Sequence, residues 1–205
     1  MSGIGMLARW IARPGRNAEA GDLLRDALPL VMIESGTLAW FPLRFAETGF
    51  GVFASFRDLA SRRAHLDGAA HELLWDKAPL VFDGAPRVDE LDIVAEKLPP
   101  VGPYGPVNHG LLLSFEAKPG MELQVRRLLQ DGFEAVREER GTVAWFGLSF
   151  GDCRFGSFAV FAEPGARFAH LAGHLPAALA RHALSKLDGM PHLELPQVLA
   201  AKIEA

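Results

Sequence analysis

The chain repeats itself at a fixed spacing, and this repeat constrains its fold more than any other feature. The segment GTLAWF at residues 36–41 returns as GTVAWF at residues 141–146, 105 positions later. The same offset aligns most of the chain without a gap. A period this long exceeds the about 20 to 50 residues of solenoid repeats and equals a small domain. We therefore expect two copies of one domain, over residues 1–98 and 110–205, joined by a Pro- and Gly-rich linker over residues 99–109.

The composition argues against several classes of protein. Of the 205 residues, 49% are hydrophobic and 22% are charged, and the formal net charge is -4. A nucleic-acid-binding protein should show a basic stripe, and a membrane helix needs about 18 consecutive apolar residues; the sequence has neither. The single cysteine, Cys153, cannot form an internal disulfide, and we expect a free surface thiol. These features indicate a cytoplasmic globular protein that binds neither nucleic acid nor membrane.

The pattern of apolar residues predicts the same order of elements in each copy: strand, helix, strand, strand, helix, strand. In the first copy the strands are expected near residues 6–13, 37–45, 50–56 and 88–98, and in the second copy the last strand is expected near residues 193–203. This order is that of a ferredoxin-like βαββαβ domain, in which helices cover one face of a four-stranded antiparallel sheet.

Three residues mark details of the first helix. Pro29 should interrupt it in the first copy, because proline has no backbone N–H and clashes with the preceding turn. Gly36, and Gly141 in the second copy, stand where a left-handed helix cap is expected.

The strand near residues 37–45 carries bulky apolar side chains on both faces, so the face away from the helices also needs a partner. We expect this partner to be the sheet of the other copy. The predicted fold class is therefore α+β, with two ferredoxin-like βαββαβ domains paired inside one chain. Such a chain is either a monomer with an internal pseudo-dimer or a homodimer of the whole chain.

Three motifs present in both copies resemble the antibiotic biosynthesis monooxygenase family of the dimeric α+β barrel superfamily. They are Gly-Thr-x-Ala-Trp-Phe, Phe-Gly-x-Phe-x-x-Phe and Ala-His-Leu-x-Gly, which begin at residues 36, 50 and 64 and again at 141, 155 and 169. The resemblance implies an intramolecular dimeric α+β barrel. It also implies a monooxygenase that acts without a cofactor on a quinol or an aromatic polyketide-like substrate. Related proteins bind haem or have no known reaction, so the alternative is a non-catalytic binding module for an aromatic metabolite or haem.

The candidate catalytic residues are a histidine and an arginine in each copy. His65 follows Arg62 by three residues, and His170 follows Arg167 likewise, so each pair shares a helical face. The imidazole would accept a proton from a phenolic substrate, and the arginine would hold the resulting anion at a pocket between helix and sheet. The alternative interpretation is structural, because a histidine in the last turn of a helix interacts favourably with the helix dipole.

Aromatic and hydroxyl side chains are the candidate substrate-binding residues. An aromatic wall could hold a planar ligand, although such residues are more often part of a core, and threonine is common at the start of a strand. The candidates from the two copies are Trp40, Phe41 and Thr37, and Trp145, Phe146 and Thr142.

We expect no metal site and no cofactor. His170 and His174 have the i, i+4 spacing of a metal pair, but the first copy has Ala69 in place of His174 and no third ligand stands nearby. Oxygenases of the family carry an asparagine on the first strand, whereas this chain has Arg9-Trp10 and Ser114-Phe115 there. The copies also differ at residues 71 and 176, so one copy could serve only as the structural partner of the other.

Overall fold

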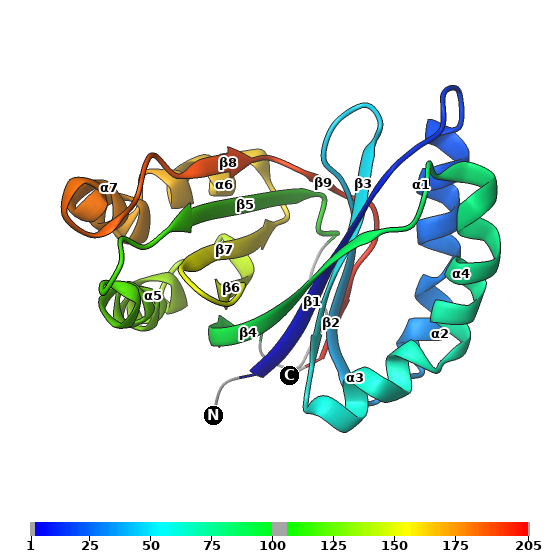
Figure 1. Ribbon diagram of the computed structural model, residues 1–205, viewed down its shortest axis with the longest axis horizontal. Helices are drawn as coiled ribbons and strands as arrows, with labels where there is room; N and C mark the ends of the chain where they lie inside the picture. Colours follow the sequence, from blue (N-terminus) through cyan, green and yellow to red (C-terminus); the bar gives the residue numbers. More distant parts are fainter. Residues whose placement is uncertain (1–2, 100–105, 205) are drawn as a thin grey trace. The chain divides into compact units, whose positions relative to one another are not determined.

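The computed structural model describes residues 3–99 and 106–204, and its elements follow the predicted order in both copies (Figure 1). The first copy contains β1 (Gly3–Ile11), α1 (Asn17–Asp26), α2 (Leu28–Met32), β2 (Thr37–Arg44), β3 (Gly49–Phe56), α3 (Leu59–Leu66), α4 (Ala69–Val81) and β4 (Arg87–Lys97). The second contains β5 (His109–Glu116), α5 (Glu122–Arg137), β6 (Thr142–Ser149), β7 (Arg154–Phe161), α6 (Pro164–Leu171), α7 (His174–Lys186), β8 (His192–Glu194), β9 (Gln197–Val198) and β10 (Lys202–Ile203). Residues 100–105 of the predicted linker lie outside the described residues.

The chain forms two compact units, and each unit takes one of its edge strands from the other sequence copy. One unit comprises Gly3–Glu90 and the C-terminal segment from Pro196, and the other comprises Leu91–Leu195. In the first unit β10 pairs with β2, so that Lys202 lies opposite Trp40. In the second unit β4 pairs with β6, so that Lys97 lies opposite Trp145. The periodicity of the sequence predicts the strands but not this exchange.

Each unit is an antiparallel sheet covered by helices, which confirms the α+β class with ferredoxin-like halves. The strand order is β10-β2-β3-β1 in the first unit and β4-β6-β7-β5-β8 in the second. In the first unit α1 to α4 cover one face of the sheet (Figure 1). The packing of the two sheets against each other stays a prediction. Within the described residues, no helix is both long and apolar enough to cross a bilayer.

Pro29 breaks the first helix, as predicted. α1 ends at Asp26, and α2 begins at Leu28 with Pro29 in its first turn. The corresponding residue of the second copy is Glu134, and α5 continues through it without a break. Proline suits the first turn of a helix, where its missing N–H has no partner to lose, so the chain starts a new helix instead of bending the old one.

The expectation of left-handed caps at Gly36 and Gly141 is wrong. Neither residue is among the described glycines with positive φ. Close packing explains the glycines instead, because a Cβ at Gly36 would lie 2.5 Å from Cβ and Oγ of Ser61 in α3. At Gly141 it would lie 2.6 Å from Cβ of Ala166 in α6. Gly36 therefore lets α3 pack closely on the start of β2, and Gly141 lets α6 pack closely on the start of β6.

The last strand of the second copy is also shorter than expected. In place of one strand over residues 193–203, the structure has β8, β9 and β10. Pro196 stands between β8 and β9, and proline cannot donate to a strand ladder. β8 pairs with β5, and both β9 and β10 pair with β2.

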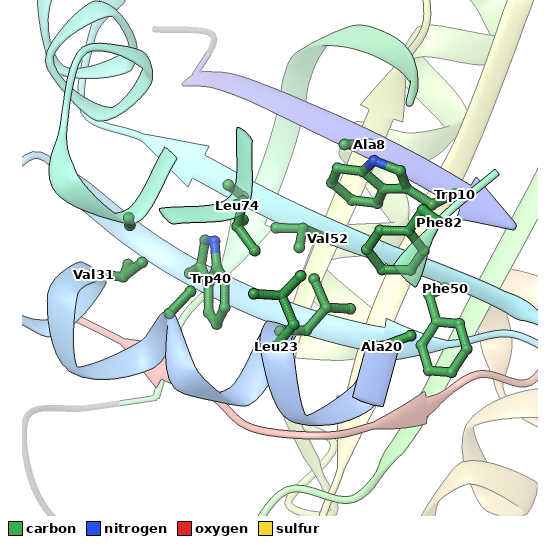
Figure 2. Close-up of a cluster of buried hydrophobic side chains, with 14 of the residues drawn as sticks. Ala8, Trp10, Ala20, Leu23, Val31, Trp40, Phe50, Val52, Leu74 and Phe82 are labelled. Carbon is green, nitrogen blue, oxygen red and sulfur yellow. The ribbon is translucent and has the colours of Figure 1, made fainter. Parts of the chain in front are cut away.

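The core of the first unit lies between its helices and its sheet. Figure 2 shows Trp10, Trp40 and Val52 of the sheet meeting Leu23 of α1 and Leu74 of α4. The Trp10 ring stacks on Phe82, with 5.3 Å between ring centroids. Alternation along each strand turns these side chains toward the helices and their neighbours to the opposite face.

Candidate active site

A cavity of about 150 Å³ lies inside the first unit, between the sheet and the helices α3 and α4. The sheet contributes mostly apolar side chains to its wall, while the helices and the start of β4 contribute the titratable ones. Its lining residues are Met6, Ala8, Trp10, Trp40, Val52, Arg62, His65, Leu66, His71, Leu74, Trp75, Ala78, Pro86, Val88 and Glu90. This is the helix–sheet position at which the sequence predicts a pocket, and it includes the candidates Arg62, His65 and Trp40.

His65 is buried in the cavity wall and bound to a carboxylate. Its Nδ1 lies 2.6 Å from Oε2 of Glu34, and the Thr37 hydroxyl donates to the same oxygen at 2.7 Å. Phe56 packs on the imidazole, with 5.2 Å between ring centroids. Three segments therefore surround the His65 side chain: the turn after α2 with Glu34, the start of β2 with Thr37, and the end of β3 with Phe56.

The electrostatics of Glu34 favour its ionised form. Burial alone would raise the pKa of the Glu34 carboxyl, but hydrogen bonds from His65 and Thr37 and the charges of His65 and Lys202 outweigh burial and lower it. An ionised carboxylate only accepts hydrogen bonds, so His65 donates through Nδ1. Nε2 is then the ring nitrogen left for other partners.

A buried lysine supports the segment that carries Glu34. Nζ of Lys202 donates to the backbone oxygens of Val31 at 2.9 Å and Glu34 at 2.6 Å, at the end of α2. Nζ also lies 3.1 Å from a carboxylate oxygen of Glu204. Lys202 belongs to β10, so the last strand of the second copy holds the Glu34 of the first copy in place.

Arg62 and Glu90 form an ion pair at the cavity wall. Nη1 of Arg62 lies 3.0 Å from Oε2 of Glu90. Nε of Arg62 is buried and has no hydrogen-bond partner. The guanidinium therefore keeps one donor that the protein itself does not satisfy.

His71 and Trp75 form a second pair of cavity residues, on α4. Their rings stack with 5.9 Å between centroids, and Trp75 is 65% exposed, which places it where the cavity meets solvent. Burial, and then the charge of His65, lower the pKa of His71, while Asp67 opposes them. The lowered pKa favours the neutral form of the His71 imidazole.

Not every candidate from the sequence lines the cavity. Phe41 follows Trp40 on β2, so it points to the opposite face of the sheet, where its ring lies 6.3 Å from that of Phe53. Phe146 occupies the same position in the second copy, 6.4 Å from Phe158. Thr37 binds Glu34 and is absent from the lining residues.

The second unit repeats the histidine–glutamate arrangement. Nδ1 of His170 lies 2.6 Å from Oε2 of Glu139, and the Thr142 hydroxyl donates to that oxygen at 2.7 Å. Nζ of Lys97 donates to the backbone oxygens of Val136 and Glu139. Burial raises the pKa of Glu139, but the bonds from His170 and Thr142 and the nearby charges lower it overall.

The two copies differ at the residues that complete the cavity. At the positions of Trp10, His71, Trp75 and Glu90 the second copy has Phe115, Pro176, Ala180 and Leu195. Arg167 consequently has no counterpart of Glu90, and its guanidinium lies over the ring of Phe168 instead, 5.8 Å from the centroid. Trp145 is fully buried, and its Nε1 has no hydrogen-bond partner.

The motifs of the sequence did not mark Glu34, Glu139, Lys202 or Trp10 as site residues. The repeat itself contained a signal for three of them, since Glu34 recurs as Glu139 and Lys97 recurs as Lys202. No such signal marks Trp10, because the second copy has Phe115 at the matching position. Among the residues whose placement is described, no three His, Cys, Asp or Glu side chains gather as a metal site would require.

Solved structures with the same architecture share little sequence with this chain. A candidate monooxygenase from Fusobacterium nucleatum subsp. nucleatum superposes with a TM-score of 0.88 at 13% identity, covering 100% of this chain and 95% of that one. A candidate monooxygenase from Lactobacillus acidophilus superposes with a TM-score of 0.86 at 10% identity, covering 100% and 98%. The chain has their fold.

A third similar structure is described as an anthrone oxidase-like protein. Its TM-score is 0.62 at 14% identity, covering 98% of this chain and 92% of that one. No protein-family model and no curated protein matches this chain. The resemblance to the antibiotic biosynthesis monooxygenase family therefore stays a prediction, and the comparisons establish the fold alone.

Proposed function

We propose that this protein is a monooxygenase that oxidises a small quinol or related hydroxylated aromatic compound without a bound cofactor. The observation that carries the proposal is the His65–Glu34 pair, 2.6 Å apart, in the wall of a mostly apolar cavity. Similar folds that include an anthrone oxidase-like protein support it.

The proposed first step is removal of a phenolic proton. Phenols have a pKa near 10, and they react with dioxygen far more readily as phenolates. Nε2 of His65 accepts the proton, while the ionised Glu34 stabilises the imidazolium that forms, as the carboxylate of a catalytic triad does. Arg62 lies beside the same cavity, and its charge favours the phenolate.

The overall reaction balances without an external reductant. The ring supplies four electrons to dioxygen, two as the quinol becomes a quinone and two as one ring C–H bond is replaced by C–OH. One oxygen atom enters the ring as this hydroxyl group, and the other leaves as water with the two hydrogens of the quinol hydroxyl groups. The product is a hydroxyquinone. The apolar wall formed by Met6, Ala8 and Val52 keeps bulk water away from the anion, which strengthens its attraction to nearby positive charge.

Oxygen uptake tests this proposal. Wild type should consume oxygen when given monocyclic quinols, and His65→Gln should lower kcat/KM by about 10²- to 10⁴-fold, the usual contribution of a general base. The matched variant His170→Gln removes the corresponding residue of the second unit and should retain most activity. Equal, slow oxygen consumption by wild type and both variants would refute the proposal.

The second candidate function is a binding module for an aromatic metabolite. The observation in its favour is the cavity face of β1, where Met6, Ala8 and Trp10 offer no amide side chain to hold dioxygen or substrate. A cavity of about 150 Å³ is below the about 300 to 1,000 Å³ of sites for drug-sized ligands, which favours a small aromatic compound over haem. Saturable ligand binding without oxygen consumption would identify this function.

A further inference from the structure

A second pocket, of about 290 Å³, lies in the first unit between α1, β2 and β9. It shares no lining residue with the cavity that contains His65. Two arginines from different elements line it, Arg25 of α1 and Arg44 of β2. Gln197 of β9 also lines it and lies opposite Arg44 in the ladder between β2 and β9. A wall that contains two guanidinium groups favours an anionic ligand.

Contacts within the unit hold both guanidinium groups at this pocket. Nε and Nη2 of Arg44 donate to two backbone oxygens of the turn between β2 and β3, each at 3.2 Å, which leaves Nη1 for another acceptor. The Arg44 guanidinium lies 5.8 Å from the centroid of the Phe50 ring. Arg25 lies near the same ring, because a Cβ at Gly21 would be 3.5 Å from its Nη1 and 3.7 Å from Cε1 of Phe50. Both arginines therefore lie beside one aromatic side chain of the pocket lining.

The start of α1 adds positive electrostatic potential to the same pocket. Asn17 and Ala18, the first two residues of this helix, are part of the lining. The side chain of the preceding residue, Arg16, makes no capping hydrogen bond, and the first N–H groups of a helix have no acceptor within the helix. The N-terminus of a helix attracts negative charge, so it supports the preference that the two arginines establish.

One carboxylate in the lining competes with an anionic ligand. Oδ1 of Asp22 lies 2.6 Å from Nη1 of Arg25. The Asp22 side chain is 69% exposed and that of Arg25 is 47% exposed, so solvent weakens this ion pair. The lining keeps two positive charges against one negative charge. A ligand with more than one negative charge therefore replaces Asp22 at Arg25 more readily than a singly charged ligand does.

The arrangement of the donors suits a phosphate group better than a carboxylate. The donors come from α1, β2 and β9 and so approach the pocket from several sides. A carboxylate has two oxygens in one plane, whereas a phosphate monoester has three terminal oxygens and a charge of about −1.5 to −2 at pH 7. The volume of about 290 Å³ equals that of about ten water molecules in the liquid. It therefore has room for a phosphate group and a body of a few atoms.

We infer that this pocket binds small phosphate monoesters, with Arg25 and Arg44 as the residues that hold the phosphate group. The inference goes beyond the proposed function, because the pocket is separate from the cavity of His65 and does not depend on the chemistry proposed there. Gln130 and Ser149 stand at the positions of Arg25 and Arg44 in the second copy. We therefore expect one phosphate site for each chain.

Isothermal titration calorimetry of the whole chain at low ionic strength and pH 7.5 tests the inference. The probes are glycerol 3-phosphate and 3,4-dihydroxybutanoate, which has a carboxylate in place of the phosphate ester. Wild type should bind glycerol 3-phosphate at one site for each chain and at least fivefold more tightly than the carboxylate. Inorganic phosphate should compete for the same site, and added salt should weaken binding because it screens exposed charges.

Three variants test the assigned residues. Arg25→Gln and Arg44→Gln should each weaken glycerol 3-phosphate binding about tenfold, as expected for the loss of a hydrogen bond to a charged group. Arg25→Gln decides the question even if Arg44→Gln loosens the turn between β2 and β3, because the Arg25 side chain bonds only to exposed Asp22 among the described residues. Asp22→Asn removes the competing carboxylate and should strengthen binding about threefold.

Two control variants separate this pocket from other sources of positive charge. Arg16→Gln removes a charge from the same end of α1, but Arg16 is not in the lining. Arg62→Gln removes the guanidinium of the cavity that contains His65. Both should change the affinity for glycerol 3-phosphate less than threefold.

Four outcomes would overturn the inference. They are no saturable binding of glycerol 3-phosphate by wild type, equal affinity for the carboxylate, unchanged affinity in Arg25→Gln, and a tenfold loss in either control variant. None of them involves oxygen consumption, so failure of this inference is distinguishable from failure of the proposed reaction.

Discussion

Nδ1 of His65 and Oε2 of Glu34 lie 2.6 Å apart, although the two residues are 31 positions apart in the chain. His170 and Glu139 repeat the same contact at the same distance. The pair is therefore part of the duplicated domain, whereas four residues of the cavity lining, Trp10, His71, Trp75 and Glu90, are replaced by other residues in the second copy. This distinction determines what each substitution is expected to do.

Replacing Glu34 should reduce stability in a pH-dependent way. Hydrogen bonds to charged groups contribute about 1.5–3 kcal/mol, so Glu34→Gln should lower the free energy of unfolding by about that amount at pH 7. Because the folded-state pKa of Glu34 is lowered, its contribution is present above the ordinary pKa of about 4.3. The contribution is lost as the pH falls through the folded-state pKa.

Urea denaturation of Glu34→Gln from pH 7 to pH 3 measures this effect. The difference in the free energy of unfolding between wild type and Glu34→Gln should disappear as the pH is lowered toward 3. Glu139→Gln should show the same loss of stability but keep oxygen-consuming activity, and exposed Glu47→Gln is the neutral control. A difference in the free energy of unfolding that stays constant from pH 7 to pH 3 would contradict the lowered pKa of Glu34.

Gly36→Ala should displace α3. The new Cβ would lie 2.5 Å from the Ser61 side chain, and overpacking of this kind costs about 1–3 kcal/mol. Since α3 carries both Arg62 and His65, ligand affinity should fall together with the melting temperature. Gly165→Ala is the control, because nothing lies within 4 Å of that Cβ position; a Gly36→Ala protein as stable as wild type would show that α3 is not held by this contact.

Lys202→Met should remove the cap from the end of α2. The carbonyl oxygens of Val31 and Glu34 would lose their buried donor, which we expect to lower the free energy of unfolding by about 3 kcal/mol. Lys97→Met removes the matching contacts of the second unit. Histidine NMR signals distinguish the two: Lys202→Met should move those of His65, and Lys97→Met those of His170. The reverse pattern would contradict the strand exchange.

His71 should titrate below the ordinary histidine pKa. Burial and the neighbouring His65 charge lower its pKa, so the folded protein binds fewer protons than the unfolded chain as the pH falls below about 6.5. His71 therefore lowers the free energy of unfolding at pH values below about 6.5. His71→Asn should make this decrease in stability smaller. An NMR titration that places the His71 midpoint at or above 6.5 would contradict this prediction.

Local patterns predicted much of the architecture for identifiable reasons. Alternation and helical spacing marked most elements, and Pro29 marked the break between α1 and α2 because its effect on the backbone is local. The last strand of the second copy was less predictable, since the strand is interrupted at Pro196 and its later segments, β9 and β10, pair with β2. Gly36 was misinterpreted because a close approach to Ser61 and a left-handed turn both select glycine.

The sequence by itself determined the duplication, the order of elements and a histidine–arginine face on α3, because each depends on neighbours within one element or on direct comparison of the copies. Only the tertiary structure decided that Glu34 binds His65, that Lys202 reaches the backbone of Glu34 across 168 residues, and that Trp10 and Trp40 line one cavity. The reason is that such contacts arise where distant segments fold together. Nothing in the local spacing of residues specifies which distant partners will meet.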